Sequence, residues 1–375
     1  MDFGFSDEQE LLRTEVRKLL DEACPLSEVR ALQETPDGHS PEVWKQLGEL
    51  GWLGLVVSEE HGGAALGWLD LIVVLEETGR SLFPGPLVSN TLAAVTLADA
   101  ADTGQQGRWI PGLSDGSRIG TVAVLDERHA FWPESLQLRG QRDANGWRLS
   151  GEKRFVTDPT AADLFVVAFR TGDGPEDLAL GVVEGGAPGV SARSFPTLDQ
   201  TRRLGNLELR EARIADDAVL GAPGEAWPAI ERLLDRGAIA VAAEMLGAAQ
   251  AALDLTVQYA MDRVQFGSPI GRYQGVKHPL AEMHVQLESA RSLLYYAAWA
   301  LDASPADVPR AASRAKAHMT EVFNRIGTDA IQLHGTLAYT DEYPAQLYYK
   351  RSKFARPLFG DADHHYDRLL RRRGL

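Results

Sequence analysis

Residues 259–283 read Tyr-Ala-Met-Asp-Arg-Val-Gln-Phe-Gly-Ser-Pro-Ile-Gly-Arg-Tyr-Gln-Gly-Val-Lys-His-Pro-Leu-Ala-Glu-Met, and no other stretch of the 375-residue chain is as informative. Gly267, Pro269 and Gly271 predict a sharp break between two helices, the second of which starts near Gln274. The break gathers an arginine, two glutamines and an aromatic residue, a set that can hold a phosphate and a planar ring. The alternative is an interhelical turn with a structural ion pair.

The composition restricts the classes of protein to which the chain can belong. The formal net charge is −15, which argues against nucleic acid or an anionic membrane as the main partner. Cys24 is the single cysteine, so an internal disulfide and a cysteine-based zinc site are excluded. The first residues show no secretory signal pattern, and no apolar run reaches membrane-spanning length. We therefore expect a water-soluble, cytoplasmic protein.

The chain divides into three zones of different periodicity. Residues 1–118 are predicted to be helical, with a capping-box spacing at Ser6 and Gln9. Residues 119–224 change to a period of two, and Asn145-Gly146 predicts a hairpin turn. The strands expected in this zone are 119–125, 136–139, 147–149, 164–169, 178–183, 190–195 and 207–214.

Residues 225–375 return to long helices with two apolar stripes of bundle-core spacing. The first stripe is Leu280, Met283, Leu287, Ala290, Leu294, Ala297 and Leu301. The second stripe is Ala312, Ala315, Met319, Val322, Ile326, Ala330 and Leu333. The sequence thus predicts a mostly helical α+β protein whose middle zone forms an antiparallel barrel or sandwich.

The segment at 259–283 resembles the helix–loop–helix signature of the acyl-CoA dehydrogenase family, and the order of the three zones is similar to that family's layout. The resemblance covers nearly the whole chain. It implies an N-terminal helical domain at 1–118, a middle β domain at 119–224 and a C-terminal four-helix bundle at 225–375. It also implies an FAD-dependent oxidoreductase of lipid metabolism that converts an acyl-CoA thioester to a trans-2-enoyl-CoA.

Residues 151–157, Gly-Glu-Lys-Arg-Phe-Val-Thr, resemble the family's G-x-K-x-[WF]-[IV]-T strand. The resemblance implies that Phe155 lies against the isoalloxazine ring and that Thr157 hydrogen-bonds near flavin N5; the alternative is an ordinary barrel strand. Residues 332–336, Gln-Leu-His-Gly-Thr, resemble the family's Q-x-x-G-G loop, with a threonine in place of the second glycine. The other residues that the resemblance assigns to FAD binding are Arg263, Gln265, Phe266, Gln274, Gln332, Gly335 and Asp361.

Three departures from the family pattern concern the flavin strand and the catalytic base. Residues 125–130, Leu-Asp-Glu-Arg-His-Ala, stand where the family has T-E-P-x-x-G-S-D. Phe359 and Gly237 occupy the two positions that carry the base in other members, and neither accepts a proton. Glu244, seven residues after Gly237 and on the same helix face, is a candidate base, and Asp235 is a shorter second candidate. The alternative for Glu244 is a structural pair with an arginine on a neighbouring helix.

The resemblance also indicates the partners. It implies an acyl-CoA substrate, an electron-transfer flavoprotein as acceptor, and a homo-oligomer or a heterotetramer with a related subunit, because these C-terminal groups usually serve a neighbour's FAD. The altered base region resembles actinobacterial members that act on bulky steroid-derived acyl-CoAs. Two other functions stay open: a non-catalytic partner subunit and a flavin-dependent monooxygenase. No metal site is expected, since adjacent His364 and His365 point about 100° apart on a helix.

Overall fold

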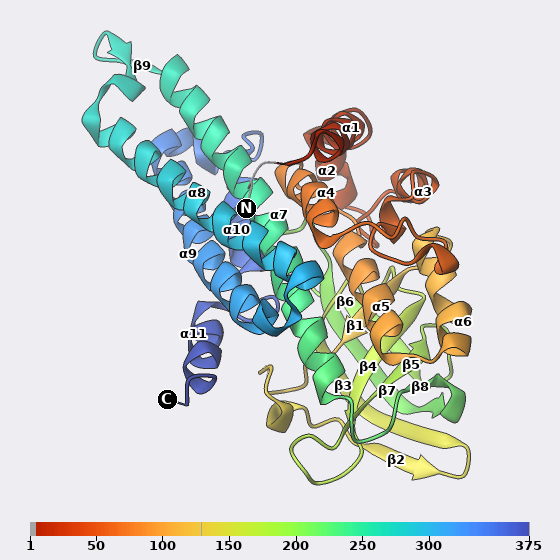
Figure 1. Ribbon diagram of the computed structural model, residues 1–375. Coiled ribbons are helices and arrows are strands. Elements are labelled where there is room, and N and C mark those ends of the chain that lie inside the picture. Colours follow the sequence, from red (N-terminus) through yellow and green to blue (C-terminus); the bar gives the residue numbers. More distant parts are fainter. Residues whose placement is uncertain (1–4, 129, 375) are drawn as a thin grey trace. The chain divides into compact units, whose positions relative to one another are not determined.

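The computed structural model describes residues 5–128 and 130–374. The N-terminal tetrapeptide and His129, both considered above, lie outside the described residues. Contacts divide the chain into two compact units (Figure 1). The unit that we call the helical unit comprises Met1–Ala31, Trp68–Phe83 and Ala238–Leu375, and the sheet unit comprises Leu32–Gly67 and Pro84–Gly237. The division into three domains at 118 and 224 stays a prediction.

The helical unit is built from long helices whose ends follow the sequence signals. The capping box at the start of α1 is confirmed, since the Ser6 hydroxyl accepts from Gln9 N and the Gln9 side chain accepts from Ser6 N. α8 begins at Gln274 as predicted. The helices are α1 (Asp7–Ala23), α4 (Trp68–Arg80), α7 (Trp227–Asp262, from Ala238 on), α8 (Gln274–Ala303), α9 (Val308–His334), α10 (Ala345–Ala355) and α11 (Ala362–Arg371).

Both predicted apolar stripes lie in the core of this unit. Helices α8 and α9 pack against each other, and α10 and α11 pack on α9. Only the stripe ends are partly exposed: Leu280, Leu301 and Leu333. Among the described residues, α7 is the one helix long and apolar enough to cross a membrane, but 78% of its most apolar window is buried. That burial is typical of a core helix in a globular protein.

The sheet unit holds two four-stranded sheets, ordered β1-β4-β5-β8 and β2-β3-β7-β6. The middle zone is therefore β-rich as predicted, although β1 pairs with β4 in parallel. Helix α2 (Leu26–Gln33) leads into this unit. The other elements are α3 (Pro41–Glu49), α5 (Leu87–Ala100), α6 (Thr103–Ser114), β1 (Gly120–Ala123), β2 (Gly140–Asp143), β3 (Gly146–Thr157), β4 (Leu164–Arg170), β5 (Leu178–Glu184), β6 (Val190–Ser194), β7 (Leu204–Ala215) and β8 (Val219–Leu220).

The predicted hairpin is present, but its first strand was placed too early. β2 pairs with β3 from Asp143↔Gly146 onward, so Ala144 and Asn145 form the loop. Residues 136–139 are not a strand: Arg139 forms only an isolated bridge with Arg170, whose backbone N donates to Leu138 O at 2.7 Å. Side chains bind other backbone groups of this segment. The Asp126 carboxylate accepts from the amides of Gln137 and Leu138, and Arg170 donates to the carbonyl of Leu136.

Candidate flavin and substrate site

The flavin strand predicted from the sequence, β3, is bulged where Phe155 lies. The pairing of β3 with β7 shifts register between Lys153 and Val156, and Phe155 has a φ of 53°. A bulge redirects the side chain of the extra residue. Phe155 is consequently 38% exposed while Lys153 and Val156 are buried, and its ring makes an edge contact with Phe195 at 5.9 Å. This exposed aromatic fits the stacking role expected of it.

A buried ion pair holds the first half of this strand segment. Lys153 is fully buried, and its Nζ lies 2.7 Å from Asp126 Oδ1 and donates to Val124 O at 2.9 Å. Burial lowers the pKa of Lys153, an effect that Asp126 opposes. The departure from the family pattern at 125–130 thus includes a structural residue. This pair was not predicted from the sequence, although a lysine at an inward-facing strand position is a signal for a buried counter-ion.

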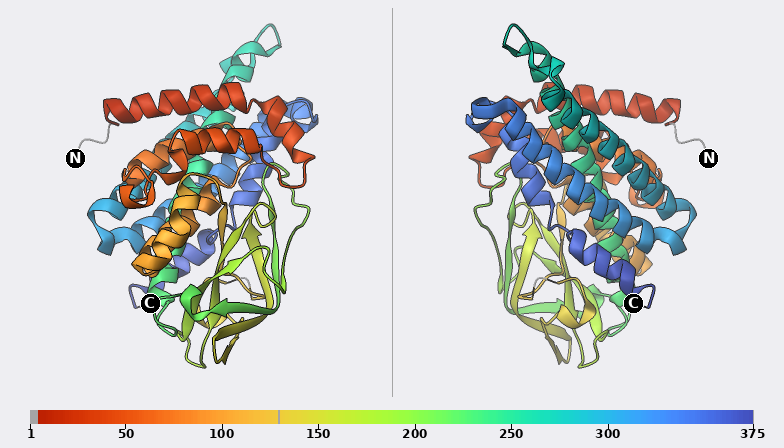
Figure 2. Two further views of the ribbon diagram at one scale, coloured as in Figure 1. Left: turned by 90° about the vertical axis from the view of Figure 1, so that its right-hand side faces the viewer. Right: turned by 90° about the vertical axis from the view of Figure 1, so that its left-hand side faces the viewer.

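Residues 263–274, within the segment 259–283, form an exposed arm on the helical unit. Helix α7 ends at Asp262, one residue before Arg263, and a short hairpin of β9 (Val264–Gln265) and β10 (Ser268–Pro269) follows (Figure 2). Its loop residues, Phe266 and Gly267, have φ values of 52° and 77°, as a type I′ turn requires. Phe266 is 92% exposed.

The structure brings the predicted cofactor residues of this arm together on one exposed surface. Arg263, Gln265, Phe266 and Gln274 are all exposed. Stacking of Tyr259 on His334, with ring centroids 4.5 Å apart, joins the end of α7 to the end of α9. This contact places exposed Gln332 and Gly335 beside the same end of the unit. Phe155 and Thr157, in contrast, belong to the sheet unit.

Glu244 lies at a close crossing of α4 and α7. A Cβ on Gly79 would be 2.0 Å from the carbonyl oxygen of Glu244, and one on Gly247 would be 1.8 Å from that of Glu76. The two glycines therefore allow the backbones of α4 and α7 to touch, and a larger residue at either position would prevent this contact. Glu244 itself is 8% exposed. The crossing fixes the Glu244 backbone, and hence the direction in which its carboxylate leaves the helix.

Asp235 is buried on the same helix but leaves it in another direction. It lies nine residues before Glu244, which at 3.6 residues per turn is a rotation of about 900°, or half a turn net. Gly237 and Glu244, seven residues apart, share one face. Of the two candidates, only Glu244 thus follows the face marked by Gly237. Both catalytic assignments stay predictions.

The buried side chain of Lys316 holds the turn around Phe359. Fully buried Lys316 donates to Arg356 O at 2.9 Å, to Gly360 O at 2.8 Å and to Thr320 Oγ1 at 3.2 Å. Burial lowers the pKa of Lys316 to about 7. Phe359 has a φ of 54°. Asp361, which we expected at the cofactor, accepts from His364 N at 3.0 Å and caps α11.

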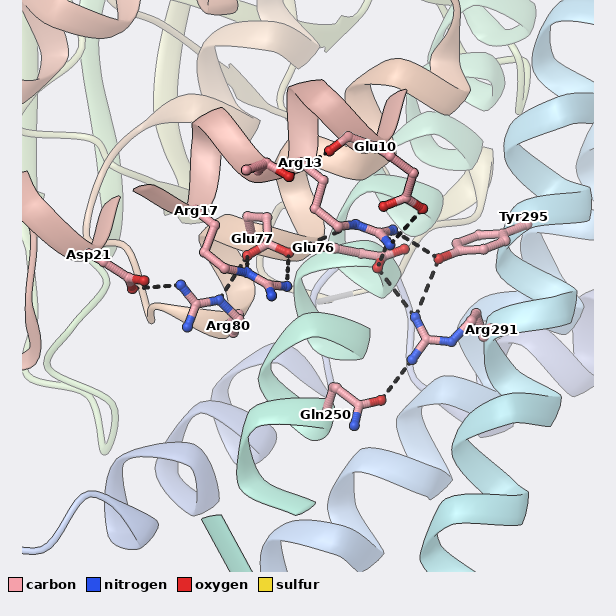
Figure 3. A network of polar contacts seen from close by, with 11 residues as sticks. Glu10, Arg13, Arg17, Asp21, Glu76, Glu77, Arg80, Gln250, Arg291 and Tyr295 are labelled. Atoms are coloured by element: carbon pink, nitrogen blue, oxygen red, sulfur yellow. Dashed lines mark hydrogen bonds and ion pairs between the residues drawn. The ribbon is translucent and has the colours of Figure 1, made fainter. Parts of the chain in front are cut away.

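Other buried carboxylates of the helical unit lie in a charged pocket of about 420 Å³ (Figure 3). Glu76 Oε2 lies 3.3 Å from Arg291 and 3.5 Å from Arg13. Burial raises the pKa of Glu76 to about 7, although both arginines oppose the shift. Glu77 pairs with Arg17 at 2.7 Å and Arg80 at 2.8 Å. These pairs account for both carboxylates without a catalytic role.

Comparisons with known proteins agree with this architecture. The acyl-CoA dehydrogenase N-terminal domain model matches residues 6–117, and the C-terminal domain model matches 224–373. The chain is 34% identical over 357 residues to the acyl-CoA dehydrogenase IpdE2 of Mycolicibacterium smegmatis, covering 95% of each protein. It superimposes with a TM-score of 0.91 on a chain of the ChsE4–ChsE5 complex from Mycobacterium tuberculosis, at 26% identity over 99% of this chain and 98% of that chain. A Tcur3481–Tcur3483 steroid ACAD gives a TM-score of 0.87 at 31% identity, over 97% of this chain and 96% of that chain.

The fold and the two matching domain models define a flavin-dependent oxidoreductase with long core helices and a β-rich middle region. The chain belongs to the acyl-CoA dehydrogenase family. It is an FAD-dependent enzyme that acts on CH–CH donors and dehydrogenates an acyl-CoA thioester between its α and β carbons.

Proposed function

We propose that this enzyme dehydrogenates a bulky, steroid-derived acyl-CoA and uses Glu244 to remove the α proton. The observation that carries the proposal is the placement of Glu244. It is a buried carboxylate at the α4–α7 crossing, on the helix face of Gly237. A carboxylate held on a rigid helix can take a proton at a fixed position. Phe359 cannot serve as the catalytic base, because its side chain accepts no proton.

Each part of the chain has a distinct task in this proposal. Phe155 and Thr157 orient the flavin ring, and the arm residues Arg263, Gln265 and Gln274 bind the diphosphate and adenosine side. The chemistry that bound FAD would supply is acceptance of the β hydrogen as a hydride. Glu244 holds the α proton on its carboxylate after abstraction.

The exposed arm supports an oligomer in which one subunit completes the FAD site of the next. Met261 is 61%, Val264 54%, Tyr339 79% and Phe266 92% exposed. An apolar surface of this kind on a globular protein usually marks a contact with another chain. Both structural relatives described above are named as pairs of proteins. We propose a homo-oligomer or a heterotetramer with a related subunit.

One relative supports the proposed substrate class. A steroid ACAD is among the similar structures at 31% identity, which supports a steroid-derived acyl-CoA as the substrate. We propose an electron-transfer flavoprotein as the acceptor and the cytoplasm as the location.

The test is anaerobic bleaching of the flavin absorbance by a steroid-derived acyl-CoA. Glu244→Gln should retain bound FAD but bleach about 10²–10⁴-fold more slowly, the usual contribution of a positioned base. The control is Asp235→Asn, which should bleach at nearly the wild-type rate because Asp235 leaves the other side of α7. Normal bleaching by Glu244→Gln would remove Glu244 from the mechanism.

A second candidate, a non-catalytic partner subunit, is favoured by the non-ionisable Phe359 and Gly237. In that case the purified chain would carry no flavin alone and would complete the FAD site of a co-expressed relative. A third outcome, FAD that ignores acyl-CoA but reacts with oxygen once reduced, would indicate a monooxygenase.

A further inference from the structure

The residue after Thr157 is tied into a buried polar contact of the sheet unit. Asp158 is 4% exposed, and its carboxylate accepts from the hydroxyl of Ser89 on α5. Arg202 Nη2 lies 3.9 Å from the same carboxylate oxygen. Ser89 is fully buried and Arg202 is 5% exposed. Two polar side chains from separate segments thus converge on the Asp158 carboxylate.

The backbone of the same segment is held as well. Asp158 N donates to Arg203 O at 3.0 Å, and Thr121 Oγ1 donates to Thr157 O at 2.7 Å. Thr157 therefore has its carbonyl fixed by β1 and the next residue fixed by the 202–203 segment. The hydroxyl that we expect to meet flavin N5 is carried by a backbone that is bound on both sides.

These contacts matter because two residues of the segment have an unfavourable backbone conformation. Phe155 has a φ of 53° and Asp158 a φ of 51°. Non-glycine residues in the left-handed region persist where the surrounding structure over-determines them. Aspartate tolerates this region better than most residues. A buried arginine, in turn, requires a carboxylate beside it, because an uncompensated buried charge is strongly unfavourable.

We propose that Asp158, together with Ser89 and Arg202, is a positioning group that holds Phe155 and Thr157 in the conformation that meets the flavin. The flavin contact itself rests on the function proposed above. Asp158 acts through Thr157 and does not touch the reacting atoms. Its loss should free the segment first and weaken the flavin contact as a consequence.

The experiment compares Asp158→Asn with wild type in two measurements. Asparagine keeps the left-handed preference and the shape but removes the charge. Hydrogen exchange of amides 155–158 in the FAD-free protein should be about tenfold faster, because local opening becomes easier. FAD binding to the FAD-free protein should weaken about tenfold, with a shifted flavin absorption band. Arg202→Lys keeps the charge, so its hydrogen exchange at 155–158 and its FAD binding should stay close to wild type. Arg202→Met removes the charge and should change both.

The matched control is Glu77→Gln, which also breaks a buried ion pair, but in the helical unit. It should leave exchange at 155–158 and the flavin band as in wild type. If Asp158→Asn does not fold, Ser89→Ala removes one hydrogen bond and should show the same changes, about threefold in size.

Unchanged exchange at 155–158 in the Asp158 and Ser89 variants would overturn the positioning role. A wild-type protein that binds no FAD under any condition would instead contradict the proposed function. The exchange measurement would then still decide whether Asp158 holds the segment, since it uses FAD-free protein.

Discussion

The strand segment from Lys153 to Asp158 and the arm from Arg263 to Gln274 are both expected to contact FAD, yet they are built in opposite ways. The strand segment is flanked by two buried ion pairs, Lys153–Asp126 and Asp158–Arg202. Most residues of the arm are exposed, and its Phe266 is 92% exposed. The first surface is organised by its own chain. In the second, the structure orders the turn but leaves most side chains exposed, as the proposed role in a neighbour's site requires.

Removing one partner of the buried pair should have the largest effect on stability. Lys153→Met leaves Asp126 charged and buried, and should lower the free energy of unfolding by about 3–5 kcal/mol. Chemical denaturation of the FAD-free protein measures the loss. Asp126→Asn, which keeps an acceptor for the amides of Gln137 and Leu138, is the milder companion. A loss below about 1 kcal/mol for Lys153→Met would show that the pair does not organise this strand.

The charged pocket of the helical unit tests whether a buried carboxylate makes the stability of the protein depend on pH. The pKa of Glu76 is raised by burial to about 7 from an ordinary value of 4.5. The folded protein therefore binds more protons than the unfolded chain between these values. Stability should fall by up to about 3 kcal/mol as the pH rises from 4.5 to 7. Glu76→Gln should lack this slope in denaturation curves, and an identical slope in both proteins would assign it to other groups.

A substitution at the α4–α7 crossing, where Glu244 lies, should have an intermediate effect on the free energy of unfolding. Gly247→Ala places a methyl group where the Glu76 carbonyl now lies, and should cost about 1–3 kcal/mol by pushing α4 and α7 apart. If Glu244 is the base, this displacement should also slow flavin bleaching. Gly275→Ala is the control, because a Cβ there meets open space. Equal stability of the two variants would contradict the tight crossing.

The arm should give the smallest effect on stability and a specific effect on the cofactor. Arg263→Gln should change the free energy of unfolding by less than about 0.5 kcal/mol, because the side chain is exposed. The assembled protein should nevertheless retain about tenfold less FAD, since a charged contact to the diphosphate is lost. Arg272→Gln, on the same arm and also exposed, should retain FAD normally. Parallel absorbance and sedimentation measurements separate the loss of FAD from the loss of assembly.

Short-range patterns predicted the elements well. The capping box at Ser6, the start of α8 at Gln274 and both bundle stripes depend on spacing along one helix, and all are confirmed. The strand expected at 136–139 was wrong, because the segment pairs with Arg170 through one isolated bridge only, while the side chains of Asp126 and Arg170 bind other backbone groups. The assignments of single residues to FAD and to catalysis stay predictions.

The sequence by itself indicated the family through the resemblance at 259–283. It also determined the order of most helices and strands and the break between α7 and α8, because periodicity and turn residues act over a few positions. The tertiary structure alone decided which charges are buried together. Lys153 with Asp126, Asp158 with Arg202, and Gly79 against Glu244 are each joined across many residues of chain. No local pattern encodes these contacts, since each depends on two segments that meet only when the chain is packed.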